Sequence, residues 1–267
     1  MLSHKKWEEF CKEIQHTNTI LAHEIKNSNE PWVIIKHDVE TNPKAALEIA
    51  KIENKYGIEA TFYVQGYLIS GNVKIFKEIE SLGHEVTYHY DVLDANSGDF
   101  GKAKKEFKEY LDAFSKAGFK VKTVCPHGNP LMKREGWSSN RDFFECPEVR
   151  SEFPDILDIV VDIESISNEF IYISDAGYGF NEILDISGKD KNKLHKSKPI
   201  DILRISEIIM QKSVVISTHP HRWFKYEALF IFRKSFFQFA KRIARFFYKF
   251  PLLRVLISKL FFLAKKI

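Results

Sequence analysis

The sequence predicts a mostly parallel α/β fold of the barrel type. Apolar runs of β character alternate along the chain with amphipathic helical segments, and short links that often contain a glycine join them. Several of the apolar runs end in aspartate, glutamate or histidine. Because the carboxyl ends of parallel strands lie together at one face of an α/β barrel, we expect a metal or acid–base site at that face.

The elements follow from hydrophobic periodicity. Residues 4–28 carry apolar side chains at helical spacing and predict an amphipathic helix ahead of the fold, with a break near residues 17–18. Strands are expected over residues 32–37, 60–64, 85–88, 121–125, 156–163, 170–173 and 213–218. Helices are expected over residues 43–56, 73–82, 99–117 and 201–211. Residues 126–156 and 186–199 predict irregular structure.

Composition and charge divide the chain of 267 residues into three parts. Residues 1–29 are the N-terminal helical segment, residues 30–224 the α/β barrel, and residues 225–267 a basic helical tail. Residues 222–267 contain 12 lysines and arginines against one acid, whereas residues 1–221 contain 28 basic and 35 acidic residues. The net charges of +11 and −7 indicate two physical roles within one chain. The three cysteines include no CxxC pair and predict reduced thiols in a cytosolic protein, without a secretion signal or an ordinary membrane span.

Asp38 and Glu40 stand two residues apart at the end of the first expected strand, so their side chains face the same side. Paired carboxylates at this place could bind a divalent metal, or one could bind the metal while the other takes up a proton. The alternative is a solvated strand end that caps the next helix.

Three histidines follow other expected strands. His89 carries an imidazole of the kind that binds zinc, manganese, iron, cobalt or nickel. His127 lies in a loop fixed by Pro126 and Gly128, and His219, which precedes a proline, suits a general acid or base. Each histidine taken singly is more often an ordinary surface, core or turn residue. Together they indicate a site, because the ends of the strands converge in space.

Four segments occur in the order typical of one family. They are Ile-Ile-Lys-His-Asp-Val-Glu at 34–40, Gly-Ile-Glu-Ala-Thr-Phe-Tyr-Val at 57–64, Gly-His-Glu-Val-Thr-Tyr-His at 83–89 and Ile-Ser-Thr-His at 216–219. Residues 30–224 resemble the polysaccharide deacetylases of the NodB-homology type, which form carbohydrate esterase family 4. The second and third segments, at this distance from one another, are the most specific part of the resemblance.

The resemblance implies a distorted (β/α) barrel of the glycoside hydrolase/deacetylase type that hydrolyses the N-acetyl group of a sugar. It also implies one bound divalent metal ion, for which zinc is our first choice and manganese, nickel or cobalt are alternatives. Carried over to this chain, Asp38 is the base that activates the attacking water, His219 protonates the leaving amine, and His89 is a metal ligand.

The chain also departs from the family pattern. The usual adjacent aspartates are replaced by His37-Asp38-Val39-Glu40, Leu93 stands where a second ligand histidine is expected, and His127 lies where an arginine motif is expected. We assign Glu40 and His127 as the remaining metal ligands, which makes the chain a divergent HDVD-type branch. A one-residue shift would instead make Asp38 the ligand and place His37 at the position of the base. We assign His37 and Asp175 to substrate binding, although Asp175 is equally interpretable as a turn residue.

The tail has the composition of a helix that lies on a membrane. From Phe232 to Phe250 apolar residues recur at steps of three and four, and lysines and arginines occupy the other faces. Such a helix binds anionic lipid at the membrane surface. The alternative is a helix packed on the barrel or in a dimer. We expect no nucleic-acid partner, because no recognised nucleic-acid module accompanies the charge.

Two functions follow. The first is a metal-dependent hydrolase that removes an acetyl group from an N-acetylated sugar in surface polysaccharide or glycolipid biosynthesis. It would act in the cytoplasm at the inner face of the membrane, on a lipid- or nucleotide-linked saccharide. The alternative, favoured by Leu93, is a catalytically inactive barrel that binds a saccharide or a partner enzyme at the membrane surface.

Overall fold

The computed structural model describes residues 2–129, 132–167, 169–175, 179–186 and 197–226. They contain a nine-stranded sheet with the order β5-β4-β3-β2-β1-β9-β6-β7-β8. The strands are β1 (Val33–Val39), β2 (Thr61–Gln65), β3 (Glu85–Tyr90), β4 (Thr123–Pro126), β5 (Leu157–Asp158), β6 (Phe170–Ser174), β7 (Asn181–Ile183), β8 (Ser197–Pro199) and β9 (Ser213–Thr218). All pairs from β5 to β6 are parallel, and β7 and β8 add antiparallel pairs at one edge.

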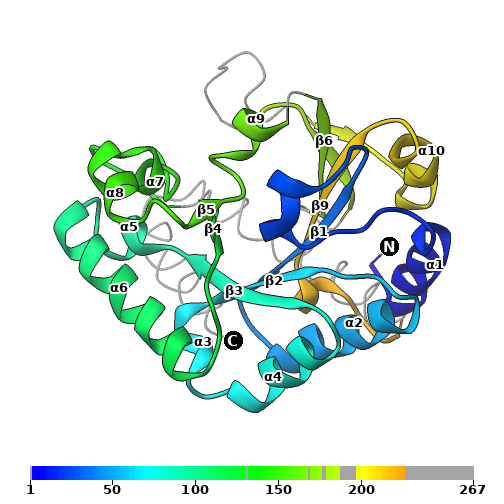
Figure 1. Cartoon of the computed structure of the whole chain (residues 1–267), viewed down its shortest axis with the longest axis horizontal. Helices are drawn as coiled ribbons and strands as arrows, with labels where there is room; N and C mark the ends of the chain where they lie inside the picture. The colour runs from blue at the N-terminus through cyan, green and yellow to red at the C-terminus, as the bar shows by residue number, and fades with distance from the viewer. Residues whose placement is uncertain (1, 130–131, 168, 176–178, 187–196, 227–267) are drawn as a thin grey trace, which may run out of the picture.

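Helices lie around the outside of the sheet (Figure 1). The α-helices are α1 (His4–Ile14), α2 (Pro43–Lys55), α3 (Gly66–Ile69), α4 (Val73–Ser81), α5 (Val92–Ala95), α6 (Phe100–Lys116), α7 (Asp142–Glu145), α8 (Pro147–Glu152), α9 (Ile163–Ile166) and α10 (Ile205–Ile209). Three short 3₁₀ helices are η1 (Ala22–Asn27), η2 (Ile202–Arg204) and η3 (Pro220–Arg222). Strands that alternate with helices in a mostly parallel sheet confirm the predicted α/β fold class.

The sheet curls as a barrel does. In a flat sheet β1 and β4, with two strands between them, would lie about 14 Å apart. Lys36 Nζ on β1 nevertheless lies 3.2 Å from Cys125 Sγ on β4, and the Tyr63 hydroxyl on β2 lies 3.1 Å from Thr123 Oγ1 on β4. The inner faces of these strands are therefore turned toward one another. In the described part of the chain β5 and β8 are the two edges of the sheet, so the barrel is open between them.

The curled sheet separates two cores. The larger core lies between the sheet and the outer helices, and Trp7, Phe10 and Ile14 of α1 belong to it. The smaller core fills the interior of the barrel toward the amino-terminal ends of its strands. There Ile20 and Ile25 pack with inner-face residues such as Ile34, Tyr63 and Val215. The Ala22 N–H donates to Thr61 Oγ1 at the start of β2, so η1 closes the amino-terminal end of the barrel. The opposite, carboxyl end of the inner face is left for polar residues.

Several expected elements differ from those observed. The helix expected over residues 4–28 ends at Ile14, and the chain continues through η1. The helix expected over residues 201–211 is divided into η2 and α10. The short elements α7, α8, β7 and β8 lie in or beside stretches expected to be irregular. The strand expected over residues 156–163 is β5 alone, because Asp158 Oδ1 accepts the N–H groups of Val160 and Val161 and so turns the chain.

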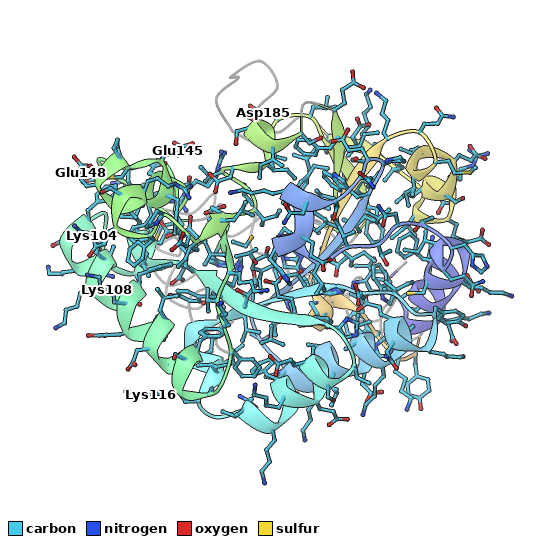
Figure 2. The ribbon with its side chains drawn as sticks, in the orientation of Figure 1. Lys104, Lys108, Lys116, Glu145, Glu148 and Asp185 are labelled. Carbon is cyan, nitrogen blue, oxygen red and sulfur yellow. The ribbon has the colours of Figure 1, made fainter. Side chains whose placement is uncertain are left out.

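Charged side chains cover the outer rim, among them Lys104, Lys108 and Lys116 of α6 (Figure 2). Lys104 and Lys108 form ion pairs with Glu152 of α8. Within the described ranges, no helix has both the length and the hydrophobicity needed to span a membrane. Almost all of the predicted basic tail, residues 227–267, lies outside the described residues.

Asp158 is expected to make the stability of the fold depend on pH. Burial raises the pKa of this carboxyl group to about 6 from 3.8, although the Tyr90 hydroxyl donates to it at 2.6 Å. The folded protein therefore holds this proton more tightly than the unfolded chain does. The stabilisation is fully present below about pH 4 and is lost as the pH rises through 6, a loss of about 3 kcal/mol.

We therefore expect Asp158→Asn to raise the free energy of unfolding at pH 8 by up to about 3 kcal/mol and to change it little at pH 4. Urea unfolding of both proteins at the two pH values measures the difference. An equal difference at pH 4 and pH 8 would show that Asp158 does not titrate as described.

Candidate active site

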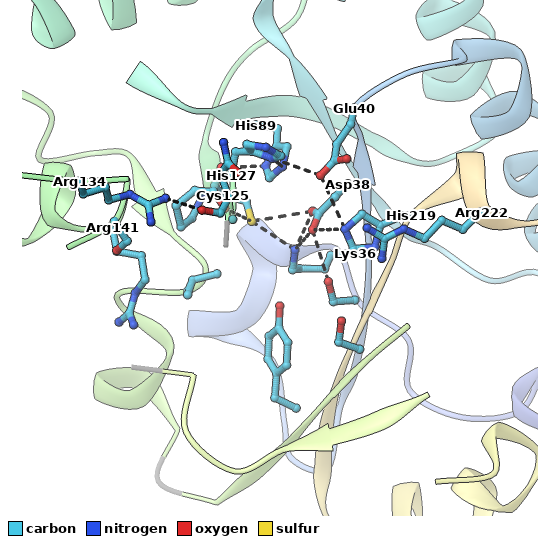
Figure 3. A pocket seen from close by; sticks show the side chains of 18 residues that line it. Lys36, Asp38, Glu40, His89, Cys125, His127, Arg134, Arg141, His219 and Arg222 are labelled. Atoms are coloured by element: carbon cyan, nitrogen blue, oxygen red, sulfur yellow. Dashed lines mark hydrogen bonds and ion pairs between the residues drawn. The ribbon is translucent and has the colours of Figure 1, made fainter. Parts of the chain in front are cut away.

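Five of the seven residues assigned from the sequence line one cavity at the carboxyl ends of the parallel strands, namely Asp38, Glu40, His89, His127 and His219 (Figure 3). The cavity has a volume of about 570 Å³. In the strand register, His89 of β3 is aligned with Gln65 of β2 and with Cys125 of β4, so the ends of these three strands lie at the same level beside the cavity. The residues that line the cavity are Lys36, Asp38, Glu40, His89, Cys125, Pro126, His127, Gly128, Asn129, Arg134, Ser139, Arg141, Val160, Tyr172, Ser174, Ser217, His219 and Arg222.

Glu40, His89 and His127 form a compact group of metal-ligand type, with donor atoms all within 4.8 Å of one another. His127 Nδ1 lies 3.1 Å from Glu40 Oε1 and 3.3 Å from His89 Nε2. Ligands of a tetrahedral zinc ion are separated by about 3.3 Å, given zinc–nitrogen distances of about 2.0–2.1 Å. Two imidazoles and one carboxylate beside an open cavity therefore fit a divalent ion of the zinc type.

The ring of His89 is already oriented for this role. His89 Nδ1 lies 3.0 Å from the Cys125 carbonyl oxygen, to which it donates, so the lone pair of Nε2 faces His127. Such a hydrogen bond from the second ring nitrogen is the usual support of a metal-binding histidine. Burial lowers the pKa of His89 to about 4, so its imidazole is neutral, the form that binds metals, at neutral pH.

Two hydrogen bonds to the His127 backbone hold the loop that carries this residue. The backbone N–H of His127 donates to the Tyr90 carbonyl at 2.7 Å, and Asn140 Nδ2 donates to the His127 carbonyl at 2.9 Å.

His127 and Glu40 shift one another's pKa values. Burial disfavours the charged form of His127, but the hydrogen bond and the charge of Glu40 raise the pKa of His127 above its ordinary value. Burial would raise the pKa of Glu40, and its hydrogen bond with His127 holds that pKa well below the usual range.

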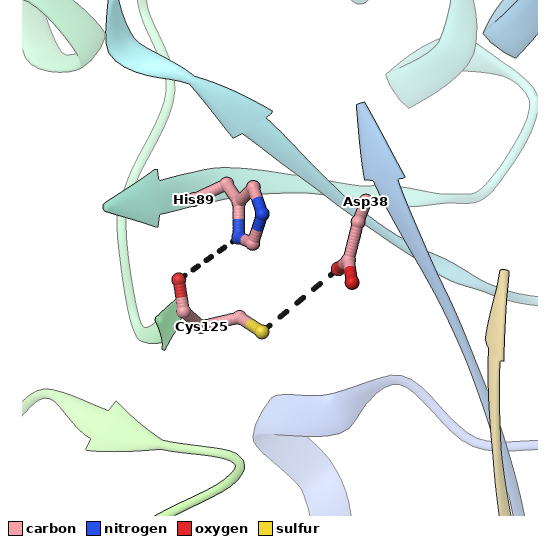
Figure 4. A group of neighbouring side chains, drawn as sticks. All are labelled: Asp38, His89 and Cys125. Atoms are coloured by element: carbon pink, nitrogen blue, oxygen red, sulfur yellow. Dashed lines mark hydrogen bonds between the residues drawn. The ribbon is translucent and has the colours of Figure 1, made fainter. Parts of the chain in front are cut away.

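A second group of ligand type, Asp38, His89 and Cys125, shares His89 with the first (Figure 4). It is the weaker candidate for two reasons. Both Asp38 oxygens are engaged by Lys36 Nζ, at 2.6 and 2.8 Å. Burial also raises the pKa of the Cys125 thiol well above its ordinary value, and a protonated thiol is a poor metal ligand.

Lys36 and Asp38 form a buried ion pair on the inner face of β1. The two residues are two apart on the strand, and their side chains are 1% and 9% exposed. Burial disfavours the ammonium, yet the Asp38 carboxylate holds the pKa of Lys36 well above its ordinary value. Burial likewise disfavours the carboxylate, but Lys36 keeps the pKa of Asp38 well below its usual range. Lys36 therefore fixes both the charge and the orientation of Asp38.

His219 and Asp175 form the second functional pair. Asp175 Oδ1 lies 2.6 Å from His219 Nδ1, and Asp175 Oδ2 accepts the His219 N–H at 2.9 Å. Donation from Nδ1 leaves His219 Nε2 facing the cavity, 3.8 Å from Glu40 Oε1 and 3.9 Å from Asp38 Oδ2. The assignment of Asp175 to substrate binding is corrected, because its side chain is completely buried behind His219. Its geometry is that of a residue that orients the histidine.

The assignment of His37 to substrate binding is also corrected. Alternation along β1 turns its ring to the outer face, away from Asp38 and the cavity. There His37 Nε2 lies 2.7 Å from Glu53 Oε1 of α2, and His37 Nδ1 lies 2.6 Å from Thr218 Oγ1. The ring stacks on Phe62 and is completely buried, so it cannot contact a substrate.

Leu93, at the position where the resemblance leads us to expect a ligand, is buried in α5 and does not line the cavity. Sequence reasoning missed four basic residues that do, namely Lys36, Arg134, Arg141 and Arg222. Alternation from Asp38 could have identified Lys36, since residues two apart on a strand share a face. No comparable signal marks the arginines, which lie outside the strands.

No protein-family model matches this chain, and no curated protein matches it. Comparison with solved structures finds members of carbohydrate esterase family 4, the family that the sequence segments resemble. One is a pseudoenzyme of that family from Bacillus anthracis, 14% identical, with a TM-score of 0.43; the match covers 80% of this chain and 62% of that protein. This chain thus spans less than two thirds of that protein's length.

Two further matches are esterases of the same family. One, from Streptococcus mutans, is 15% identical over 74% of this chain and 77% of its own, with a TM-score of 0.45. The other, from Streptomyces lividans and in complex with acetate, is 14% identical over 72% of this chain and 81% of its own, with a TM-score of 0.43. At this level of similarity the comparisons say nothing about activity. Any statement about activity depends on the residues of the cavity.

Proposed function

We propose that this protein is a metal-dependent hydrolase that removes the acetyl group from an N-acetylated sugar. One observation carries the proposal: a group of metal-ligand type, a fixed carboxylate and an oriented histidine face the same cavity. Each of these three parts has its own support from a neighbouring side chain or carbonyl group. Metal-assisted amide hydrolysis can use this combination, because one part activates the attacking water and another gives a proton to the leaving amine.

The metal would be held by Glu40, His89 and His127. A divalent ion bound there would lower the pKa of water and polarise the acetyl carbonyl group. Asp38, kept ionised and oriented by Lys36, would accept the proton of the attacking water. His219 Nε2 would deliver a proton to the leaving nitrogen, while Asp175 stabilises the charged imidazole and fixes its ring.

Acetate release tests the proposal. The protein is loaded with zinc, manganese, nickel or cobalt and incubated with an N-acetylglucosamine tetramer, and acetate is measured enzymatically. We expect acetate release that stops when the metal is removed with a chelator and returns when it is restored. An absence of release with this tetramer and with N-acetylglucosamine 1-phosphate, for all four metals, would contradict the proposal.

A second function has one observation in its favour. The Lys36 ammonium engages both oxygens of Asp38, and this pairing competes with the use of Asp38 as a base. The chain would then be an inactive barrel that binds a saccharide or a partner enzyme. Sugar binding by a metal-loaded protein that releases no acetate would favour this alternative.

The sequence motivates two further parts of the proposal. The saccharide would be lipid- or nucleotide-linked, an intermediate of surface polysaccharide or glycolipid synthesis. The basic amphipathic residues 225–267 would hold the protein on an anionic membrane surface, at the cytoplasmic face.

A further inference from the structure

We propose that Asn140 is a positioning residue of the metal site, which sets the metal affinity by holding His127 in place. The inference rests on the proposed function for the three metal ligands, Glu40, His89 and His127. It goes further because it assigns a role to a side chain that is completely buried and does not line the cavity.

The position of His127 as a ligand depends on its backbone. His127 faces Glu40 and His89 with Nδ1, at 3.1 and 3.3 Å (Figure 3). Nδ1 is the ring nitrogen nearer to the backbone, so a shift of the backbone at residue 127 displaces this nitrogen almost directly. The two hydrogen bonds on that backbone, from its N–H to Tyr90 and from Asn140 to its carbonyl, therefore decide where the nitrogen lies.

Asn140 uses both ends of its side-chain amide. Its Nδ2 donates to the His127 carbonyl at 2.9 Å, and its Oδ1 accepts the backbone N–H groups of Leu93 at 3.1 Å and Asp94 at 3.0 Å. These contacts require a donor and an acceptor in one short side chain, which an amide provides. Asn140 thus connects the loop that carries His127 to α5, where Leu93 stands at the position of an expected ligand.

The same helix holds the loop at a second point. Asp94 of α5 accepts from Arg134 Nε and Nη2, both at 2.7 Å. Arg134 Nη2 also donates to the carbonyl of Asn129, two residues after His127, at 3.0 Å. Because Asp94 is itself bonded to Asn140 through its backbone N–H, the loop is held at both ends by one connected network.

Asn140→Asp separates the two ends of the amide. Aspartate keeps an oxygen for the N–H groups of α5, but it has no donor and would place a charged oxygen against the His127 carbonyl. His127 should then move away from Glu40 and His89. Metal–ligand distances tolerate only about 0.2 Å, and loss of a residue that supports a ligand usually weakens metal binding by about 10- to 100-fold.

Zinc affinity tests the inference, measured by competition with a chromophoric chelator at neutral pH. We expect Asn140→Asp to bind zinc about 10- to 100-fold more weakly than the unmodified protein. Asn72→Asp is the matched control, since Asn72 Nδ2 also donates to a backbone carbonyl, that of Leu68, at 2.9 Å, and lies outside the cavity wall. This control should keep the zinc affinity.

The absorption spectrum of the cobalt-loaded protein distinguishes positioning from a loss of stability. The spectrum reports the geometry of the ligands, so it should change in Asn140→Asp and stay the same in Asn72→Asp. Thermal melting shows whether each variant folds. If Asn140→Asp unfolds, Arg134→Lys takes its place, because lysine keeps the charge beside Asp94 without the planar fork that also reaches Asn129, and zinc binding should again weaken.

Unchanged zinc affinity and an unchanged cobalt spectrum in the folded variant, even with a lower melting temperature, would overturn the inference. Absence of zinc binding by the unmodified protein would overturn it as well. Acetate release separates it from the proposed function. Weaker zinc binding in Asn140→Asp, in a protein that releases no acetate, would contradict the hydrolase and leave the role of Asn140 standing. Acetate release with equal zinc affinity in both proteins would contradict the inference alone.

Discussion

Replacement of His219 by glutamine is expected to lower kcat for acetate release by about 100- to 10,000-fold, the usual contribution of a positioned general acid. Glutamine preserves the approximate size of the side chain and can still donate to Asp175. It cannot deliver a proton to the leaving nitrogen, so the effect should fall on kcat while KM changes little. Steady-state kinetics of the metal-loaded protein with the N-acetylglucosamine tetramer measures both constants.

Two further variants make this result interpretable. His16→Gln removes an exposed histidine outside the cavity and should leave both constants unchanged. Asp175→Asn should also lower kcat. The amide NH₂ of asparagine can donate to His219 Nδ1 and so stabilise the tautomer that is protonated at Nε2, without a carboxylate to stabilise the charged imidazolium. Turnover close to that of the unmodified protein in His219→Gln would show that another group protonates the amine.

Replacement of Lys36 by alanine is expected to lower the free energy of unfolding by about 3–5 kcal/mol, the usual cost of breaking a buried ion pair from one side. The variant leaves the Asp38 carboxylate buried without its partner, 2.6 Å from where the ammonium stood. Urea unfolding at pH 7 measures the change. Lys105→Ala, on the exposed face of α6, removes a lysine whose side chain is 81% exposed and should have little effect.

A double variant separates the ion pair from simple loss of packing. Lys36→Met with Asp38→Leu replaces both charges by apolar side chains of similar size and should recover most of the lost stability. It should also be inactive, because the proposed base is gone. A Lys36→Ala variant as stable as the unmodified protein would mean that Asp38 does not depend on Lys36 for its charge.

The sequence was sufficient for the central strands of the sheet and for the side chains at their carboxyl ends, because both depend on local pattern. β9 has the expected bounds, and β1, β2 and β3 are close to them, since apolar runs that end in polar residues define them. Asp38, Glu40, His89, His127 and His219 line one cavity for the reason given at the outset, that the carboxyl ends of parallel strands meet.

Other features depend on which strands become neighbours, and a single sequence does not fix that. Asp175 contacts His219 because β6 pairs with β9, although the two residues are 44 positions apart along the chain. Arg134 and Arg141 enter the cavity from a segment without regular hydrophobic period. The assignment of His37 to substrate binding was avoidable. Adjacent residues of a strand face opposite sides, so an inward Asp38 predicts an outward His37, as observed.

The metal content of the purified protein tests the central claim most directly. Plasma mass spectrometry is applied to the unmodified chain, to His89→Ala and His127→Ala, and to His16→Ala as a control. We predict about one divalent ion per chain in the unmodified protein and the control, and loss of that ion in both cavity variants. No bound ion after loading with zinc, manganese, nickel or cobalt, or full metal content in both cavity variants, would contradict the account.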